Sequence, residues 1–166
     1  MTVRENDHLY RPNVGLALFH RSGQVFLGKR IGVDSPYAWQ MPQGGMDPGE
    51  TPTEAALREL EEEVGVPARL VELLEETAGW IYYDFPPEVR ATLKQARNYL
   101  GQKQKWFALR FKGEDGDIRL DAHEPEFSEW RWADLASAPA SVIAFKRATY
   151  EDVARRFERY AVGNST

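Results

Sequence analysis

The sequence contains no cysteine and no long hydrophobic run. The absence of cysteine excludes disulfide bonds and thiolate metal ligands. No apolar stretch approaches the length that a membrane-spanning helix needs, and the N-terminal residues MTVRENDHLYRP lack the apolar core of a secretory signal. We therefore expect a cytoplasmic protein that does not bind a membrane.

Positive charge is also in short supply. The chain has 21 Lys and Arg residues against 26 Asp and Glu residues, which gives a formal net charge of −5. This balance argues against bulk attraction to nucleic acid, although a local basic patch can still bind a phosphorylated end. The sequence has no internal repeat, low-complexity tract or linker, and its 166 residues suffice for one domain with a sizeable core. We expect a single domain spanning residues 1–166.

Hydrophobic patterning predicts a mixed sheet between helices. Residues 14–19 and 24–29 are expected to form a hairpin, and residues 31–38 a loop. Further extended segments are predicted at residues 39–41, 70–77, 105–111 and 129–132, and the aromatic residues 80–85 are expected to form a strand or a packed loop. Pro86-Pro87 should interrupt regular structure, and the apolar periodicity of residues 142–161 predicts a helix. The order of strands, helix, strands and helix favours a three-layer α/β/α arrangement.

The most informative segment is GGMDPGETPTEAALRELEEEVGV, residues 44–66. Thr51 is a suitable N-cap, Glu54 completes a capping box with it, and Gly65 is placed to end the helix. Three glutamates share one face of this helix: Glu59, Glu62 and Glu63. A separate apolar arc is formed by Leu57, Leu60 and Val64. Burying that arc would hold the three carboxylates outward and close together.

Clustered carboxylates behind a glycine-rich loop suit a hard divalent cation. Like charges three or four residues apart repel each other, and a bound cation removes that cost. Magnesium binds through a few carboxylates together with water and substrate phosphate. We therefore predict Mg²⁺, with Mn²⁺ as the alternative, bound by Glu59, Glu62, Glu63 and the backbone carbonyl of Gly44. The simpler interpretation is a solvated acidic helix, which does not explain the loop glycines and the spacing together.

The spacing of this segment resembles the Nudix box, the signature of hydrolases that cleave a nucleoside diphosphate linked to another group. The matching positions are Gly44, Glu50, Arg58, Glu59, Leu60, Glu62, Glu63, Gly65 and Val66. The resemblance implies a single Nudix hydrolase domain, with a mixed sheet in an α/β/α sandwich and a loop–helix–loop catalytic motif. It makes the three glutamates metal ligands and catalytic residues. It also implies that Arg58 positions glutamates, whereas an exposed helix ion pair is the alternative.

Segments outside the box resemble the bacterial RNA 5′-pyrophosphohydrolase group, which also contains dinucleoside polyphosphate hydrolases. They are YRPNVG at 10–15, WQMPQGG at 39–45, GQKQKWF at 101–107, PEF at 125–127, WRW at 130–132 and FKR at 145–147. The group places an acidic residue at Glu126, as metal ligand or general base, whereas without the resemblance it is a surface loop residue. His123 has neither a partner at a suitable spacing nor a match to the group, and is interpreted as a loop residue.

Basic residues in this acidic chain are candidates for binding the phosphates of a substrate. The predicted substrate-binding residues are Arg11, Arg30, Gln43, Lys103, Lys105, Phe145, Lys146 and Arg147. Strand alternation puts Lys103 and Lys105 on one face, where they could line a polyphosphate channel together. Each basic residue taken alone is more often an ordinary surface residue. Phe145 can stack on a base or make a core contact of the last helix.

The resemblance implies three alternative functions. The first is removal of pyrophosphate from the 5′-triphosphate end of RNA, by attack of a metal-activated water on a phosphoanhydride. The second is the same chemistry on a dinucleoside polyphosphate such as diadenosine tetraphosphate or pentaphosphate. The third is a non-catalytic nucleotide-binding or RNA-binding module. The intact carboxylates of Glu59, Glu62 and Glu63 argue against the third.

Overall fold

The computed structural model describes residues 4–92 and 98–163. The strands are β1 Tyr10–Phe19, β2 Val25–Arg30, β3 Trp39–Gln40, β4 Gln43–Gly45, β5 Val71–Glu76, β6 Ile81–Asp84, β7 Gly101–Phe111 and β8 Phe127–Ala133. The α-helices are α1 Pro52–Val64, α2 Pro87–Thr92, α3 Ala138–Ser141 and α4 Arg147–Arg156. Among the described residues, none of the helices is both long and apolar enough to cross a membrane.

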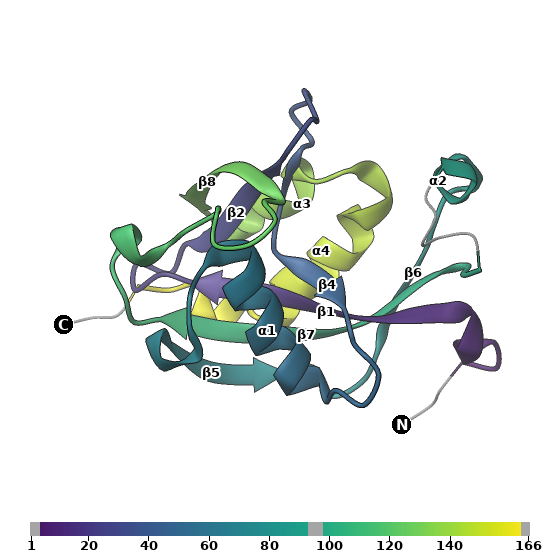
Figure 1. The fold of residues 1–166 in the computed structure, drawn as a ribbon, viewed down its shortest axis with the longest axis horizontal. Helices are drawn as coiled ribbons and strands as arrows, with labels where there is room; N and C mark the ends of the chain where they lie inside the picture. The colour runs from purple at the N-terminus through teal and green to yellow at the C-terminus, as the bar shows by residue number, and fades with distance from the viewer. Residues whose placement is uncertain (1–3, 93–97, 164–166) are drawn as a thin grey trace.

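The described strands form one mixed, eight-stranded sheet, with β3, β2, β1, β7 and β5 side by side in that order. The central strands β1 and β7 are parallel, and the other pairs are antiparallel. Helix α1 covers one face of the sheet, and α3 and α4 lie on the opposite face (Figure 1). The predicted α/β/α sandwich with a mixed sheet is therefore confirmed.

Strand β1 changes its neighbour along its length. Its first half pairs with β4, from Asn13 opposite Gly45 to Gly15 opposite Gln43. Its last residue, Phe19, pairs with Val25 at the start of β2, which closes the predicted hairpin. Because β2 and β4 meet β1 at different levels, the glycine-rich segment enters the sheet beside the N-terminal half of β1. This arrangement places the start of the Nudix-like segment beside β1, a central strand of the sheet.

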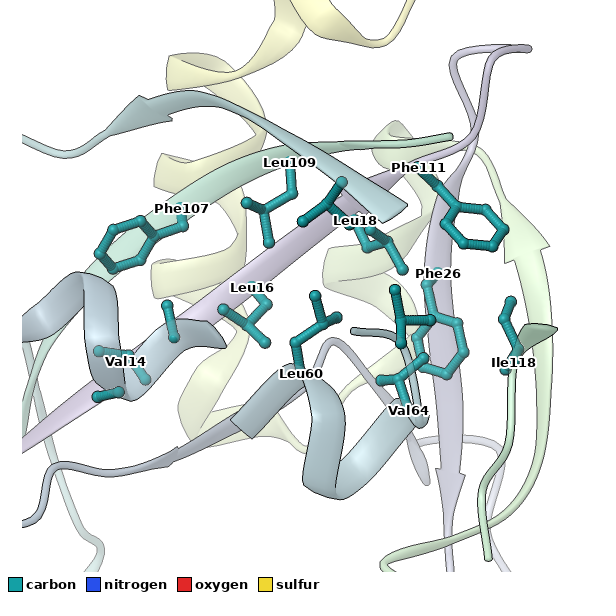
Figure 2. Packing of buried hydrophobic residues seen from close by; sticks show 14 of the residues in the cluster. Val14, Leu16, Leu18, Phe26, Leu60, Val64, Phe107, Leu109, Phe111 and Ile118 are labelled. Carbon is teal, nitrogen blue, oxygen red and sulfur yellow. The ribbon is translucent and has the colours of Figure 1, made fainter. Parts of the chain in front are cut away.

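Alternation along β1 divides the core into two layers. Val14, Leu16 and Leu18 face α1, where they meet Leu60 and Val64 (Figure 2). The intervening side chains pack on the opposite face with residues of α4, in a cluster that includes Ala17, Phe19, Trp106, Tyr150, Val153 and Phe157. Each layer buries large apolar side chains completely, and this burial is the main favourable contribution to folding.

The predicted start and end of the box helix are confirmed. The Thr51 side chain accepts a hydrogen bond from the Glu54 backbone amide at 3.2 Å, and Glu54 accepts one from the Thr51 amide at 3.1 Å. Gly65 ends α1 with a φ of 73°, a left-handed conformation that suits glycine. The segment therefore begins and ends where its capping residues place it. Only the face of the helix that does not pack on the sheet can carry catalytic side chains.

The prediction of one helix over residues 142–161 was wrong. Only α4, Arg147–Arg156, is α-helical, between 3₁₀ turns at Ala144–Lys146 and Glu158–Tyr160. Val142 has an extended backbone and joins the cluster around α4, whereas Phe145 packs with Tyr83 and Phe85. A continuous helix would hold Val142 and Phe145 on the same side, so the break lets them reach different clusters.

Two other segments extend beyond the expectations. Pro86-Pro87 end β6 as predicted, but Pro87 also begins the short helix α2, since proline is tolerated in the first turn. Strand β7 begins at Gly101, four residues before the predicted strand, because Gly101–Gln104 pair with both β1 and β6. This extension carries Gln102 into the region where the candidate site lies.

Candidate active site

A cavity of about 640 Å³ gathers most of the residues singled out in the sequence. Its lining includes Arg11, Arg30, Gln43, Gly44, Glu59, Glu62, Glu63, Glu126 and Lys146. These residues come from β1, β2, β4, α1, the loop before β8 and the turn before α4. One part of the lining is acidic and comes mainly from α1, and another part is cationic. A ligand that combines divalent metal with phosphate needs both kinds of side chain.

The carboxylates of α1 are held by burial of the opposite side of the helix. Leu60 and Val64 are completely buried against the sheet, so the helix cannot rotate freely. Glu59 and Glu63 are themselves buried, with 8% of each residue exposed, whereas Glu62 is more open. A Cβ atom on Gly44 would overlap the Glu59 carboxylate. Only glycine at position 44 therefore lets the β4 backbone come this close to the helix. The loop backbone and the helix therefore converge closely at the acidic side.

The electrostatics of this acidic side favour a cation. Glu63 Oε2 is buried without a hydrogen-bond partner. Burial, together with the neighbouring charges of Glu59 and Glu126, raises the pKa of Glu63 well above its usual value. Burial also raises the pKa of Glu59, although the Arg58 guanidinium acts in the opposite direction. Two buried carboxylates, one of which has an unpaired oxygen, are a donor set that fits Mg²⁺.

The metal-binding set is not fully assembled in the described residues. No three His, Cys, Asp or Glu side chains among them converge into a complete metal cluster. Glu62 lies 3.2 Å from the Arg58 guanidinium, and Glu126 stands on an exposed loop. The carboxylates nevertheless line one cavity, and Glu59 and Glu62 share the Arg58 guanidinium.

Arg58 contacts both the helix glutamates and the loop. Its guanidinium donates to Glu59 at 2.8 Å, to Glu62 at 3.2 Å and to the Gly45 carbonyl at 2.8 Å. It also forms a two-pronged pair with Glu50, at 2.7 and 2.9 Å, and this hydrogen bonding lowers the pKa of Glu50 to about 2. Arg58 is absent from the cavity lining. Its contacts fit a positioning role, with Glu50 bracing the loop.

Three cationic side chains line the same cavity: Arg11, Arg30 and Lys146. The Arg11 guanidinium lies against Gly45, where any side chain would displace it. Lys146 is buried, and its Nζ lies 3.4 Å from Gln40 Oε1. Burial, assisted by the positive charge of Arg30, lowers the pKa of Lys146 to about 7. The lysine is therefore poised to change its charge near neutral pH.

A second cavity of about 280 Å³ adjoins the first and shares four lining residues with it. The shared residues are Arg11, Arg30, Gln43 and Lys146. Its other lining residues include the aromatic side chains of Tyr83, Phe85 and Phe145. The ring of Phe145 lies 5.9 Å from that of Tyr83 and 6.4 Å from that of Phe85. Phe145 thus makes an aromatic contact and lines a cavity at once. We call this the aromatic cavity and the first one the acidic cavity.

Three predicted substrate-binding residues lie outside both linings: Lys103, Lys105 and Arg147. Lys103 Nζ donates to Asp7 at 2.6 Å, and Lys105 Nζ donates to the Thr77 carbonyl at 3.1 Å. Arg147 donates to the Pro139 carbonyl at 3.2 Å. The two lysines do share one strand face. A role of these three residues in binding substrate stays a prediction.

The acidic cavity also contains residues that the sequence analysis did not assign to a site: Gln40, His123 and Glu124. His123 is an exposed loop residue, as expected, but its loop reaches the cavity. The available signal was its position three residues before Glu126. Tyr83 and Phe85 were predicted only as members of the segment 80–85, and their place beside Phe145 depends on how β6 pairs with β7.

Comparison with known proteins assigns this arrangement to a family. The NUDIX domain model matches residues 9–156, and the chain belongs to this family. A protein of Acidiphilium cryptum named RNA pyrophosphohydrolase is 54% identical over 155 residues, which cover 92% of each chain. A protein of Caulobacter vibrioides with the same name is 53% identical over 165 residues, covering 98% of this chain and 95% of the relative.

Solved structures support the fold. The E. coli dihydroneopterin triphosphate pyrophosphohydrolase superimposes with a TM-score of 0.65 at 22% identity, covering 89% of this chain and 99% of that one. The C. elegans Ap4A hydrolase, in a binary complex, superimposes with a TM-score of 0.61 at 18% identity, covering 89% and 98%. At these identities the similarity concerns the architecture alone, which is the Nudix α/β sandwich.

Proposed function

We propose that this chain is a Mg²⁺-dependent RNA pyrophosphohydrolase that removes pyrophosphate from the 5′-triphosphate end of RNA. The observation that carries the proposal is a single cavity in which buried glutamates of the Nudix helix share the lining with Arg11, Arg30 and Lys146. The family membership and the two near-full-length relatives named RNA pyrophosphohydrolase support it. A single Nudix hydrolase domain over residues 1–166 and a cytoplasmic location are parts of the same proposal.

In this proposal Glu59, Glu62, Glu63 and Glu126 hold the cation, with the Gly44 carbonyl as a further oxygen. Mn²⁺ is the alternative to Mg²⁺, because it also accepts oxygen ligands. The bound cation supplies neutralisation of phosphoryl charge and a lowered pKa of water. Arg58 holds the glutamates and the loop in fixed relative positions, since it donates hydrogen bonds to both. The unpaired Glu63 Oε2 supports this assignment, because a buried oxygen without a partner is costly unless a ligand satisfies it.

In the same proposal, the cationic side chains that line the acidic cavity bind the phosphates of the substrate. Arg11 and Arg30 offer two-pronged donors to phosphate oxygens, and Lys146 offers a point charge. The aromatic cavity adjoins these cations, so a base can stack beside Phe145 while the phosphates lie in the acidic cavity. Water adds to one phosphorus, the phosphoanhydride P–O bond breaks, and a carboxylate of the acidic side accepts the water proton. The products are pyrophosphate and a 5′-monophosphorylated RNA.

The alternative function is hydrolysis of dinucleoside polyphosphates. The observation in its favour is that the aromatic cavity joins the cationic side chains directly, through Arg11, Arg30 and Lys146. A nucleoside in one cavity with a phosphate chain in the next describes both substrates equally well. The two substrates differ in the group attached to the nucleotide that occupies the site, which is an RNA strand in one case and a second nucleoside in the other.

The test is a comparison of substrates with the purified protein. We expect pyrophosphate release from 5′-triphosphorylated RNA in Mg²⁺, loss of release in a chelator, and restoration by Mg²⁺ or Mn²⁺. Diphosphorylated RNA, diadenosine tetraphosphate and pentaphosphate, and a nucleotide sugar complete the panel. Rapid cleavage of the dinucleotides with negligible release from RNA would establish the alternative. Phosphate release that is unaffected by the chelator would contradict the metal assignment.

A further inference from the structure

Gln43 places an unused hydrogen-bond acceptor where the two cavities meet. It is the first residue of β4 and lines both the acidic and the aromatic cavity. Its amide nitrogen Nε2 donates to Gln102 Oε1 at 3.5 Å. Its amide oxygen Oε1 is buried and has no hydrogen-bond partner. A buried acceptor without a donor is rare in native proteins, and a ligand is one of the partners that can satisfy it.

The orientation of this amide is set by its neighbours. Gln102 is buried, and its Oε1 accepts a hydrogen bond from the Tyr83 hydroxyl at 2.6 Å. Burial raises the pKa of Tyr83 to about 12, so the hydroxyl keeps its proton and donates at neutral pH. Because Gln102 Oε1 acts as an acceptor, Gln43 faces it with its NH₂ group. The oxygen of the same amide is therefore turned away from Gln102.

The charged groups around the aromatic cavity do not replace the missing donor once a substrate is bound. Arg11, Arg30 and Lys146 are its charged lining residues, and the proposed function assigns all three to phosphate oxygens. The Thr92 hydroxyl, also in the lining, already donates to the Val89 carbonyl at 3.1 Å. The part of the substrate that enters the aromatic cavity can therefore supply the donor for Gln43 Oε1.

We infer that Gln43 Oε1 accepts a hydrogen bond from the substrate's nucleoside and makes the enzyme prefer nucleosides that carry a donor at that position. The inference rests on the proposed function, because it takes the ligand to be a nucleoside with a phosphate chain. Aromatic side chains favour a base as the occupant, so the expected donor is a ring N–H or amino group. A ribose hydroxyl offers the same chemistry from a second source, which the experiment distinguishes.

The experiment compares triphosphorylated RNAs that differ by single donor groups in each of the two 5′-terminal nucleotides in turn. Guanosine is replaced by inosine, which lacks the 2-amino group, by purine riboside, which lacks every base N–H, or by 2′-deoxyguanosine. We expect the wild-type kcat/KM to fall about tenfold for the analogue that lacks the donor, the factor that corresponds to about 1.4 kcal/mol for an acceptor left unpaired. Loss confined to the deoxy analogue would identify the ribose hydroxyl as the donor.

Two variants connect that preference to Gln43. Gln43→Met keeps the length of the side chain but removes the acceptor, so it should process the matched analogues at equal rates. Gln43→Glu keeps an acceptor oxygen and should retain the preference, even if its absolute rate is lower. Because each ratio is measured within one variant, a general loss of activity does not imitate the result. Thermal unfolding of both variants shows whether they fold, and if the methionine variant does not, the glutamate variant and the wild-type series decide.

The outcomes separate the inference from the proposed function. Absence of pyrophosphate release from every RNA by the wild-type protein would sink the proposed function itself. Normal release with equal rates on all analogues would overturn only the role of Gln43. An unchanged preference in Gln43→Met would also overturn it, because another group would then be reading the nucleoside.

Discussion

The carboxylate of Glu59 lies directly against the backbone of Gly44, in the space that a side chain at position 44 would occupy. This contact joins the strand β4 to the outward face of α1. It explains why the sequence has glycine here, at a position where the backbone φ is not left-handed. The requirement is for close approach of two segments and not for a special backbone conformation.

Replacing Gly44 by alanine should therefore impair catalysis. The added methyl group displaces the Glu59 carboxylate, and we expect turnover to fall by about tenfold or more, since displacing a catalytic group by about 1 Å can cost about a hundredfold in rate. Gly116→Ala is the matched control, because a Cβ atom there meets nothing within 4 Å. Steady-state kinetics of both variants in Mg²⁺ would measure the effect. Equal turnover of Gly44→Ala and wild type would show that the Glu59 position is not critical.

Replacing Glu63 by glutamine should slow the enzyme and stabilise its metal-free form. Turnover should fall by roughly two or more orders of magnitude, the scale of lost metal-assisted charge stabilisation. The pKa of Glu63 is raised in the folded state, so ionisation of this carboxyl group destabilises the folded protein as pH rises above about 4.5. We therefore expect a higher Tm for Glu63→Gln than for wild type at pH 7 in a chelator, with a gap that narrows toward pH 4.

Mg²⁺ provides the control for that comparison. The wild-type Tm should rise when Mg²⁺ is added, because a ligand that binds only the folded state stabilises it. The Tm of Glu63→Gln should rise less. A variant that melts below wild type at pH 7 without metal, or gains equally from Mg²⁺, would contradict the assignment of this buried carboxylate.

Replacing Arg58 by methionine should affect both stability and kcat. The change leaves Glu50 and Glu59 without their guanidinium partner, and we expect a loss of about 2 kcal/mol in the free energy of unfolding. Lysine keeps the charge but loses the fork geometry, so Arg58→Lys should recover only part of it. Because Arg58 does not line the cavity, KM should change less than kcat. Denaturant unfolding and kinetics measure the two effects.

The control for Arg58 is the exposed pair of Arg156 with Asp152, 3.0 Å apart. Arg156→Met should change stability by less than about 0.5 kcal/mol, as is usual for a surface ion pair. Comparable losses for the two substitutions would mean that the Arg58 network contributes no more than an ordinary surface contact.

The charge of Lys146 should make substrate binding depend on pH. Its pKa is lowered to about 7 in the folded protein, so the free enzyme loses this positive charge as pH rises through about 7. KM for a triphosphorylated substrate should then increase between pH 6 and 9 at saturating Mg²⁺. Lys146→Arg stays charged and should show a flatter profile, whereas Lys146→Met should have a high KM throughout. The same pH dependence of KM in Lys146→Arg and wild type would refute this.

The sign of the stability effect of Lys146 is the opposite of that of Glu63. The unfolded lysine holds its proton up to about pH 10.5, whereas the folded one releases it near 7. Unfolding therefore takes up a proton between these values, and the contribution of Lys146 to stability increases as pH rises through that window.

The local parts of the site could be predicted from the sequence. Glu59 and Glu63 lie on one turn of a helix whose caps are Thr51 and Gly65, so their convergence depends on neighbours in the sequence. The cationic side of the cavity is different, since Arg11, Arg30 and Lys146 meet only through the pairing of distant segments. Arg11 and Lys146 belong to segments that resemble the pyrophosphohydrolase group, and Arg30 was predicted only as a basic residue in an acidic chain. No periodicity places the three together.

Strand alternation was correct for Lys103 and Lys105 but could not say which face meets the cavity. In the parallel ladder Lys105 pairs with Val14, a residue of the core layer beneath α1. Arg11 pairs with Gln102 instead, and these two alternate with the lysines and line the aromatic cavity. The choice of face is made by the register of β1 and β7, which single-sequence patterns do not contain.

Four side chains belong to both cavities at once: Arg11, Arg30, Gln43 and Lys146. A compact inhibitor anchored on this shared group would obstruct two compartments with few atoms. Resistance would then be hard to acquire, because any substitution at the junction that lowered the affinity for the inhibitor would also lower the affinity for the natural ligand.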